Sequence, residues 1–259
     1  MSFNLVKSPW NHPWESSLFD SIKQGFPNTD YNKKGHSVVW GVHRNGIGAM
    51  KQKNYSFVDM PYYHRIRNDE MKDSYWRWAY NSMHDTRKLN VPSNRFESWN
   101  VTLKPWKRDG DFILICPSSE NVTKYIYNMR QRDWIEKTKQ EIKKYTNKPL
   151  RVRLKPRKSA RVQGPDAETV SMKQELQGCY ALVTCISITA IDALLEGIPV
   201  FSDSVQCPSA WCTNRNISEI NNIAYNDREE LFYNLAYKQF SIEEYKNSVA
   251  YQLIRQYLQ

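Results

Sequence analysis

Short apolar segments alternate with longer amphipathic ones in the second half of the chain, and this alternation restricts the possible folds more than any other feature. Four segments have the composition of strands: 111–116, 150–154, 181–185 and 199–202. Three segments have helical spacing: 133–145, 171–178 and 188–196. The runs at 111–116 and 181–185 are apolar throughout, as in strands that are covered on both faces. Because strands that alternate with helices are joined by crossovers, this half is predicted to be a Rossmann-like α/β domain with a parallel sheet.

The first half of the chain shows a weaker alternation. Strands are predicted at 37–42 and 55–59, and helices at 15–24 and 74–84. Two more helices are predicted at 227–238 and 242–258, and Ser241 with Glu244 forms a capping box that opens the last one. A charged segment at 104–110 with one proline and one glycine is typical of a linker. We therefore predict two domains, 1–105 and 106–259, the second of which ends in a helical pair.

Composition excludes several classes of protein. The 259 residues are 40% hydrophobic and carry a net charge of +10, which favours polyanionic partners over a disordered chain. No run of about 18 apolar residues predicts a membrane span, and the N-terminal sequence lacks the pattern of a signal peptide, so a cytoplasmic protein is expected. Five cysteines, an odd number, argue against a disulfide framework. Cys207 and Cys212 have no second pair, so no metal site is predicted.

Polar residues follow three of the four predicted strands of the second half. Ligands of open parallel sheets bind beyond the carboxyl ends of the strands. The residues at these positions are hydroxyl-bearing or basic: Ser118, Ser119, Arg153, Lys155, Arg157, Ser187 and Thr189. Together they suit a phosphate or a diphosphate. Two alternatives remain open, namely that Ser187 or Thr189 only caps a helix, and that the basic run at 148–161 is a solvated surface.

Two of these segments resemble those of a known enzyme class. The segment 187–200, Ser-Ile-Thr-Ala-Ile-Asp-Ala-Leu-Leu-Glu-Gly-Ile-Pro-Val, resembles the S-x-x-x-x-E-A-L-x-x-G-x-P-V segment of GT-B glycosyltransferases, including capsule-type transferases. The segment 152–157, Val-Arg-Leu-Lys-Pro-Arg, is similar to their basic strand followed by proline. The resemblance covers residues 112–202. Asp192 stands where glutamate is usual and Lys155 where histidine is common, which leaves ribose recognition and an acid/base role of position 155 in question.

The resemblance implies a fold and a reaction. It implies a GT-B-like α/β fold of two small Rossmann-like halves with parallel sheets, in which 106–259 binds a nucleotide sugar and 1–105 binds the acceptor. The donor site would comprise Ser118, Ser119, Arg153, Lys155, Arg157, Ser187, Thr189 and Asp192. A general base in the first half would take the proton of the acceptor hydroxyl. Asp59 and His43, each at the end of a predicted strand, are the first two candidates, and His64 is the third. The nucleotide sugar would be a co-substrate, with no tightly bound cofactor and no metal.

The acceptor is less constrained. Residues 227–240 resemble the ending of phage-encoded proteins, some of which are described as glycosyltransferases, and phage enzymes that glycosylate modified DNA bases are GT-B proteins. A hydroxymethylated pyrimidine in double-stranded phage DNA would agree with the charge of +10 and with a location in the host cytoplasm. His64, Arg65 and Arg67 lie among aromatic residues and are the candidate acceptor contacts. The alternatives are a transferase for a saccharide acceptor and a nucleic-acid-binding protein without enzymatic activity.

Overall fold

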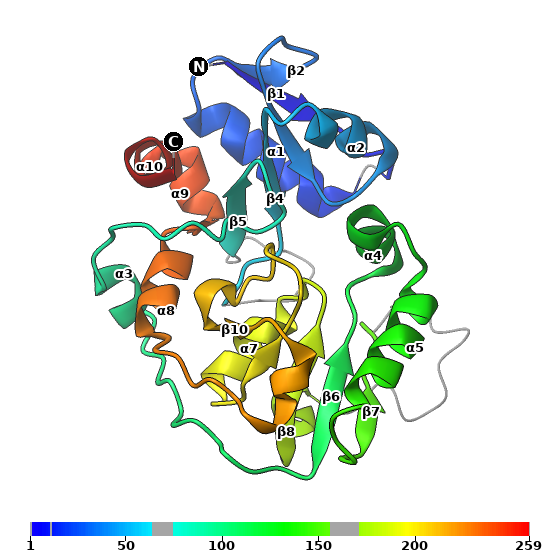
Figure 1. The fold of residues 1–259 in the computed structure, drawn as a ribbon. Coiled ribbons are helices and arrows are strands. Elements are labelled where there is room, and N and C mark those ends of the chain that lie inside the picture. Colours follow the sequence, from blue (N-terminus) through cyan, green and yellow to red (C-terminus); the bar gives the residue numbers. More distant parts are fainter. Residues whose placement is uncertain (1, 11, 64–74, 156–170, 259) are drawn as a thin grey trace. The chain divides into compact units, whose positions relative to one another are not determined.

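The chain is divided into two compact units. The computed structural model describes residues 2–10, 12–63, 75–155 and 171–258. One unit comprises Met1–Asn100 together with Glu230–Gln259, and the other comprises Val101–Glu229 (Figure 1). We call them unit 1 and unit 2. The division differs from the expected one, because the C-terminal segment belongs with the N-terminal half and not with residues 106–229.

Unit 2 is built on one parallel sheet, as the sequence predicts. Its strands are β6 (Phe112–Cys116), β7 (Leu150–Val152), β8 (Cys179–Thr184), β9 (Val200–Phe201) and β10 (Thr213–Asn214). They follow the order β10-β9-β8-β6-β7, and every pairing is parallel. The chain steps from β6 outward to β7 and from β8 outward in the opposite direction to β9. The order of the strands therefore reverses between β6 and β8, which is where such sheets bind their ligands.

Helices cover both faces of this sheet. They are α4 (Glu120–Tyr127), α5 (Gln131–Ile142), α6 (Met172–Glu175) and α7 (Thr189–Leu195), and two 3₁₀ turns follow β9: η2 (Ala210–Cys212) and η3 (Ile217–Asn221). Because right-handed crossovers in opposite directions lie on opposite faces, α5 covers one face and α7 the other. All five residues of β6 are buried, which explains the apolar composition of that strand.

Unit 1 contains a mixed sheet. Its strands are β1 (Phe3–Val6), β2 (Thr29–Tyr31), β3 (His36–Trp40), β4 (Tyr55–Asp59), β5 (Tyr75–Tyr80) and β11 (Gln239–Ser241), in the order β11-β5-β4-β3-β1-β2. The first four strands are parallel to one another, whereas β5 pairs antiparallel with β4 and with β11. The helix predicted at 74–84 is wrong. Trp76 and Trp78 are fully buried on one face of β5 while Arg77 lies on the other, and aromatic residues favour such strands.

Helices of unit 1 come from both ends of the chain (Figure 1). They are α1 (Pro13–Gly25), α2 (Arg44–Lys51), α3 (Asn94–Glu97), α8 (Glu229–Ala236), α9 (Ile242–Lys246), α10 (Val249–Leu253) and a final π turn (Ile254–Leu258). The capping box of Ser241 and Glu244 is present at α9, but the predicted helix 242–258 is interrupted at Ser248, which has φ +68°. No helix in the described part of the chain is both long and apolar enough to cross a membrane.

The C-terminal segment packs into the core of unit 1. Phe240, Tyr245 and Ile254 share one apolar cluster with residues of α1 and with Trp76 and Trp78. Helices α1 and α9 approach so closely that a Cβ atom on Gly25 would lie 1.8 Å from the carbonyl oxygen of Tyr245. Glycine is therefore required at this crossing.

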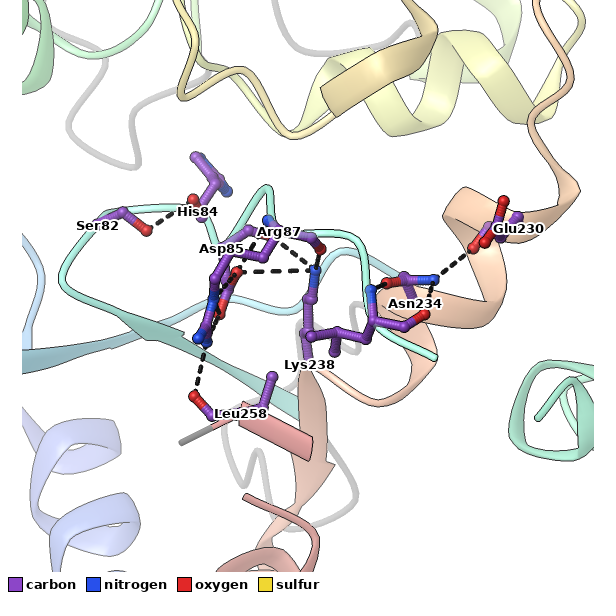
Figure 2. A network of polar contacts seen from close by, with 9 residues as sticks. Ser82, His84, Asp85, Arg87, Glu230, Asn234, Lys238 and Leu258 are labelled. Atoms are coloured by element: carbon purple, nitrogen blue, oxygen red, sulfur yellow. Dashed lines mark hydrogen bonds and ion pairs between the residues drawn. The ribbon is translucent and has the colours of Figure 1, made fainter. Parts of the chain in front are cut away.

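A buried polar network attaches the same segment to the loop after β5 (Figure 2). Lys238 is 1% exposed, and its Nζ donates to the carbonyl oxygen of Asp85 at 2.9 Å and to that of Arg87, with the Asp85 carboxylate 3.8 Å away. Arg87 donates to the carbonyl oxygen of Leu258 at 2.7 Å. Asn234 accepts from the amide of Leu89 at 2.6 Å. Burial lowers the pKa of Lys238 to about 8, from an ordinary value of 10.5.

This pKa predicts a pH-dependent stability. Folded Lys238 loses its proton near pH 8, whereas the unfolded chain keeps it to about pH 10.5. The unfolded state binds more protons in this window, so stability rises with pH there. We measure the free energy of unfolding by urea denaturation at pH 7.5 and at pH 9.5. Between these two values it should rise by about 1–2 kcal/mol more for the wild type than for Lys238→Met. Lys33→Met, at an exposed site, should run parallel to the wild type. A parallel profile for Lys238→Met would contradict the prediction.

Candidate functional site

The loops after β6 and β8 are bonded to each other where the strand order of unit 2 reverses. Thr184 Oγ1 donates to the carbonyl oxygen of Cys116 at 2.6 Å and accepts from the amide of Ser187 at 3.2 Å. Ser118 Oγ accepts from the amide of Ile186 at 3.1 Å. The bonds of Thr184 to Cys116 and of Ile186 to Ser118 join the two strand ends, and the bond of Ser187 to Thr184 fixes the turn after β8.

The hydroxyl residues predicted for the donor site lie together at this edge, but they differ in burial and in hydrogen bonding. Ser118 is 5% exposed and its oxygen is already used to join the loops. Ser119 precedes α4 and makes no capping bond with its side chain. Ser187 Oγ accepts from the amide of Thr189 at 3.3 Å, so a local turn role is real for this residue. Thr189 Oγ1 is buried without a hydrogen-bond partner among the described residues. Thr189 Oγ1 thus has unused hydrogen-bonding capacity next to the loop junction, and Ser119 lies beside it without capping α4.

The predicted charged residues of the donor site are more dispersed. Arg153 follows β7, and its Nη1 lies 3.0 Å from Glu175 Oε2 of α6, with both side chains about one-fifth exposed. Lys155 is exposed at the same strand end. Asp192 is half-buried in the first turn of α7. Arg157 lies outside the described residues. Since β7, β6 and β8 are parallel neighbours, Arg153 and Lys155 lie at the same edge of the sheet as Ser119 and Thr189.

A cavity of about 330 Å³ opens at this edge, and sequence analysis missed it. It lies between α5, the ends of β8 and β9, and the start of η3. Aromatic side chains line it from α4, α5 and the following turn: Tyr127, Trp134 and Tyr145. Thr184, which also ties the loops together, contributes to its wall, so the cavity adjoins the loop junction.

Polar contacts hold the rim of the cavity. Tyr127 donates its hydroxyl proton to Asp203, and burial is the main reason that the pKa of Tyr127 is raised, so the phenol stays protonated. Arg215 donates to the carbonyl oxygens of Ser204 and, at 3.2 Å, Ala210, which orders the loop after β9. Asp203 follows the fourth predicted strand of this half. Applying the strand-end rule to that strand would have found it.

In unit 1, the two candidate bases both lie at the carboxyl edge of the parallel strands. Asp59 ends β4 with its side chain 30% exposed, and its Oδ2 accepts from Arg77 Nη2 at 3.1 Å. Arg77 is 5% exposed and also donates to the carbonyl oxygens of Met60 and Met83, at 2.7 and 3.1 Å. Asp59 is therefore the counter-charge of a buried guanidinium, and it still has solvent access.

His43 has a different chemical character. It is the N-cap of α2, and its Nδ1 accepts from the amide of Gly46 at 3.1 Å. Nδ1 is thus unprotonated, so the neutral ring carries its proton on Nε2, an atom that is buried without a hydrogen-bond partner in the described chain. Burial lowers the pKa of His43. These features fit a hydrogen-bond donor better than a general base. The predicted acceptor contacts His64, Arg65 and Arg67 lie outside the described residues.

The cysteines are buried free thiols, and within the described residues no group of three His, Cys, Asp or Glu side chains has the arrangement of a metal site. Cys207 Sγ lies 3.0 Å from Ser209 Oγ, and Cys212 donates to the carbonyl oxygen of Asp227 at 3.2 Å. Each therefore has a local partner. Burial raises the pKa of Cys116, Cys185 and Cys212 to about 12, so they are unreactive at neutral pH.

Comparison with known proteins identifies the architecture. No protein family and no curated protein matches the sequence. Two solved structures from Thermosulfurimonas dismutans match almost the whole chain. The KpsC β-Kdo 2,4 transferase is 11% identical with a TM-score of 0.58, over 98% of this chain and 98% of its own. The KpsC β-Kdo 2,7 transferase is 12% identical with a TM-score of 0.51, over 97% of this chain and 99% of its own. At this identity the similarity concerns the fold, and it confirms the predicted class: the chain has a GT-B-like α/β fold.

Proposed function

We propose that the protein is a glycosyltransferase that moves a sugar from a nucleotide-sugar donor to a hydroxyl group of a saccharide. The observation that carries the proposal is the aromatic cavity beside the β6–β8 loop junction of unit 2. It lies at the carboxyl edge of a parallel sheet, the usual place for a nucleotide in such folds. The similarity of fold to two sugar transferases along almost the whole chain supports the same reaction class.

The donor is assigned to unit 2 in this proposal. A volume of about 330 Å³ lies at the lower end of the range of small-molecule sites, and it accommodates a nucleoside. Trp134 and Tyr145 offer faces for a base, and Asp203 offers an acceptor. The phosphate would lie toward the loop junction, near Ser119, Thr189 and the exposed Lys155. The proposal requires no metal, because the hydroxyl groups of Ser119 and Thr189 and the ammonium group of Lys155 can stabilise the leaving phosphate.

The reaction is a substitution at the anomeric carbon. The acceptor oxygen forms the new bond to that carbon, the bond to the phosphate oxygen of the donor breaks, and the nucleotide leaves with the electron pair. The acceptor proton passes to a base, for which we propose Asp59. Its carboxylate accepts from Arg77 and is partly exposed. His43 holds its neutral proton on Nε2 and is assigned no proton-accepting role.

A saccharide acceptor is favoured over DNA. Both matched structures carry the names of sugar transferases, here β-Kdo transferases, and this supports acceptors of the glycan class. A hydroxymethylated pyrimidine in DNA is supported by the net charge of +10 and by His64, Arg65 and Arg67, which lie outside the described residues. The same charge supports the nucleic-acid-binding alternative. Both enter the tests below as competing outcomes.

Nucleotide binding can be tested by blocking the cavity. We expect one of UDP, GDP, CMP and ADP to raise the melting temperature by roughly 5–10 °C at about 100 times its Kd, which corresponds to about 2.7 kcal/mol. Thr138→Trp places a large ring in the cavity and should abolish the shift. Gln140→Trp is the matched control on the exposed side of α5 and should keep it. No shift with any nucleotide would contradict the donor site. A shift that survives Thr138→Trp would place the nucleotide elsewhere.

The base can be tested once the nucleotide is known. With the corresponding sugar donor, Asp59→Asn should lower kcat by about 10²–10⁴-fold while nucleotide affinity stays unchanged. His43→Asn retains a good N-cap and should keep kcat within tenfold. Melting temperatures check that the loss of the Arg77 pair has not unfolded unit 1. If His43→Asn lowered kcat more than Asp59→Asn did, His43 would be the base instead. Transfer to hydroxymethylated duplex DNA but to no saccharide would overturn the acceptor class.

A further inference from the structure

Strand β7 carries exposed aliphatic side chains at the edge of the unit 2 sheet. Among the described strands β7 pairs only with β6. Val152 is 37% exposed, and Leu154, which continues the strand, is 50% exposed. Single exposed aliphatic residues are ordinary, but these two are separated by two positions and share one side of the chain. They form a short apolar stripe next to solvent.

Basic side chains outnumber acidic ones around this stripe. Residues 142–155 contain six basic side chains and no acidic one: Lys143, Lys144, Lys148, Arg151, Arg153 and Lys155. Lys144 is paired with Glu141 at 2.6 Å, and Arg153 is paired with Glu175 at 3.0 Å. The other four have no carboxylate partner within the ranges that the structure describes. The segment therefore keeps a positive charge of about four after its ion pairs are counted.

The stripe and part of this charge share the α5 side of the sheet. Lys139, Lys143 and Lys148 line a groove with Leu150, the first residue of β7. Of these lysines, Lys139 is paired with Glu136 at 2.9 Å. Because side chains alternate along a strand, Val152 and Leu154 face the same side as Leu150. Arg151 faces the other side, where it stacks on the Phe112 ring at 3.7 Å. Helix α5 and strand β7 lie side by side (Figure 1). We call Lys139, Lys143, Lys148, Val152 and Leu154 the α5–β7 surface.

We propose that the α5–β7 surface docks onto a membrane that contains anionic lipids. Lysines beside an anionic bilayer are attracted to its headgroups, and aliphatic side chains among them enter the headgroup boundary. Lys143 is exposed and has no carboxylate partner in the described chain, whereas Lys148 donates to the carbonyl oxygen of Gly110 at 2.7 Å and lies over the Tyr180 ring. Docking would hold the proposed transferase at the surface of a bilayer.

Other occupants fit this surface less well. Nucleic acid binds to surfaces that combine cations with aromatic rings for base stacking, whereas the stripe is aliphatic. An added peptide strand needs a longer ladder than the three residues of β7 provide. A second copy of the chain would bring like charges together. An anionic bilayer matches both the sign of the charge and the aliphatic stripe.

Vesicle flotation tests the proposal with the full chain. At 50 mM salt the protein should float with vesicles of phosphatidylcholine and 30% phosphatidylglycerol, and should stay behind with phosphatidylcholine alone. Lys143→Glu should weaken binding by about tenfold or more, and the double substitution Val152→Ser with Leu154→Ser by a similar factor. High salt should screen the lysines from the anionic headgroups and release the protein from these vesicles.

Matched controls separate binding through this surface from the nonspecific effects of net charge and of exposed apolar side chains. Lys51→Glu reverses an exposed lysine of unit 1, and Val205→Ser removes a valine of unit 2 that is 73% exposed. Both should bind vesicles as the wild type does, and all variants should keep the wild-type melting temperature. Equal binding to neutral vesicles, or equal losses with the controls, would overturn the proposal. Binding to duplex DNA that Lys143→Glu abolishes, with no vesicle binding, would assign the surface to nucleic acid.

Discussion

The parallel pairing of β6 with β8 is the constraint on which unit 2 depends. The two strands are separated by more than sixty residues of chain, so their pairing forces one crossover to each side and creates the reversal of strand order between them. Thr184 and Ser118 then use their hydroxyl groups to bond one strand-end loop to the other. The position of the cavity beside these loops follows from the same reversal, since α5 leaves the ends of β8 and β9 partly uncovered on its face.

Unit 1 repeats this logic and adds an antiparallel edge. Its strand order reverses between β1 and β3, and Asp59 and His43 follow the neighbouring strands β4 and β3. Beyond β4 the sheet continues through two antiparallel pairings, of β4 with β5 and of β5 with the late strand β11. The charged groups near this edge are mostly structural: Arg77 is bonded to two carbonyl oxygens and a carboxylate, and Lys238 to two carbonyl oxygens. A buried charge with such partners stabilises one arrangement of the loops, because moving it would leave it unpaired.

Sequence patterns predicted the parts of the molecule whose signals are local. The uniformly apolar strand β6, the amphipathic α5 and the Ser241 capping box are each determined by neighbouring residues. The strand β5 was missed because its buried tryptophans fit a helical as well as a strand pattern, and pairing with β4 and β11 decides between them. The attachment of the C-terminal segment to unit 1 depends on contacts between residues more than 150 positions apart, such as Lys238 with Asp85. At the candidate site, strand ends predicted the loop junction, but the side-chain pairing of Arg153 with Glu175 and of Asp59 with Arg77 has no signal in the spacing of the residues.

The division of unit 1 between the two ends of the sequence has a consequence for biosynthesis. Residues 101–229 leave the ribosome as one uninterrupted stretch that contains every strand of its own sheet, whereas the N-terminal sheet lacks the partner of β5 until residue 241 has been made. During translation β5 therefore lacks its C-terminal partner until about 160 further residues have been synthesised, and helix α1 lacks its contacts with the C-terminal helices for longer still. The order of folding is thus expected to be the reverse of the order of synthesis, with the later-made module complete first and the earlier one closed only by the end of the chain.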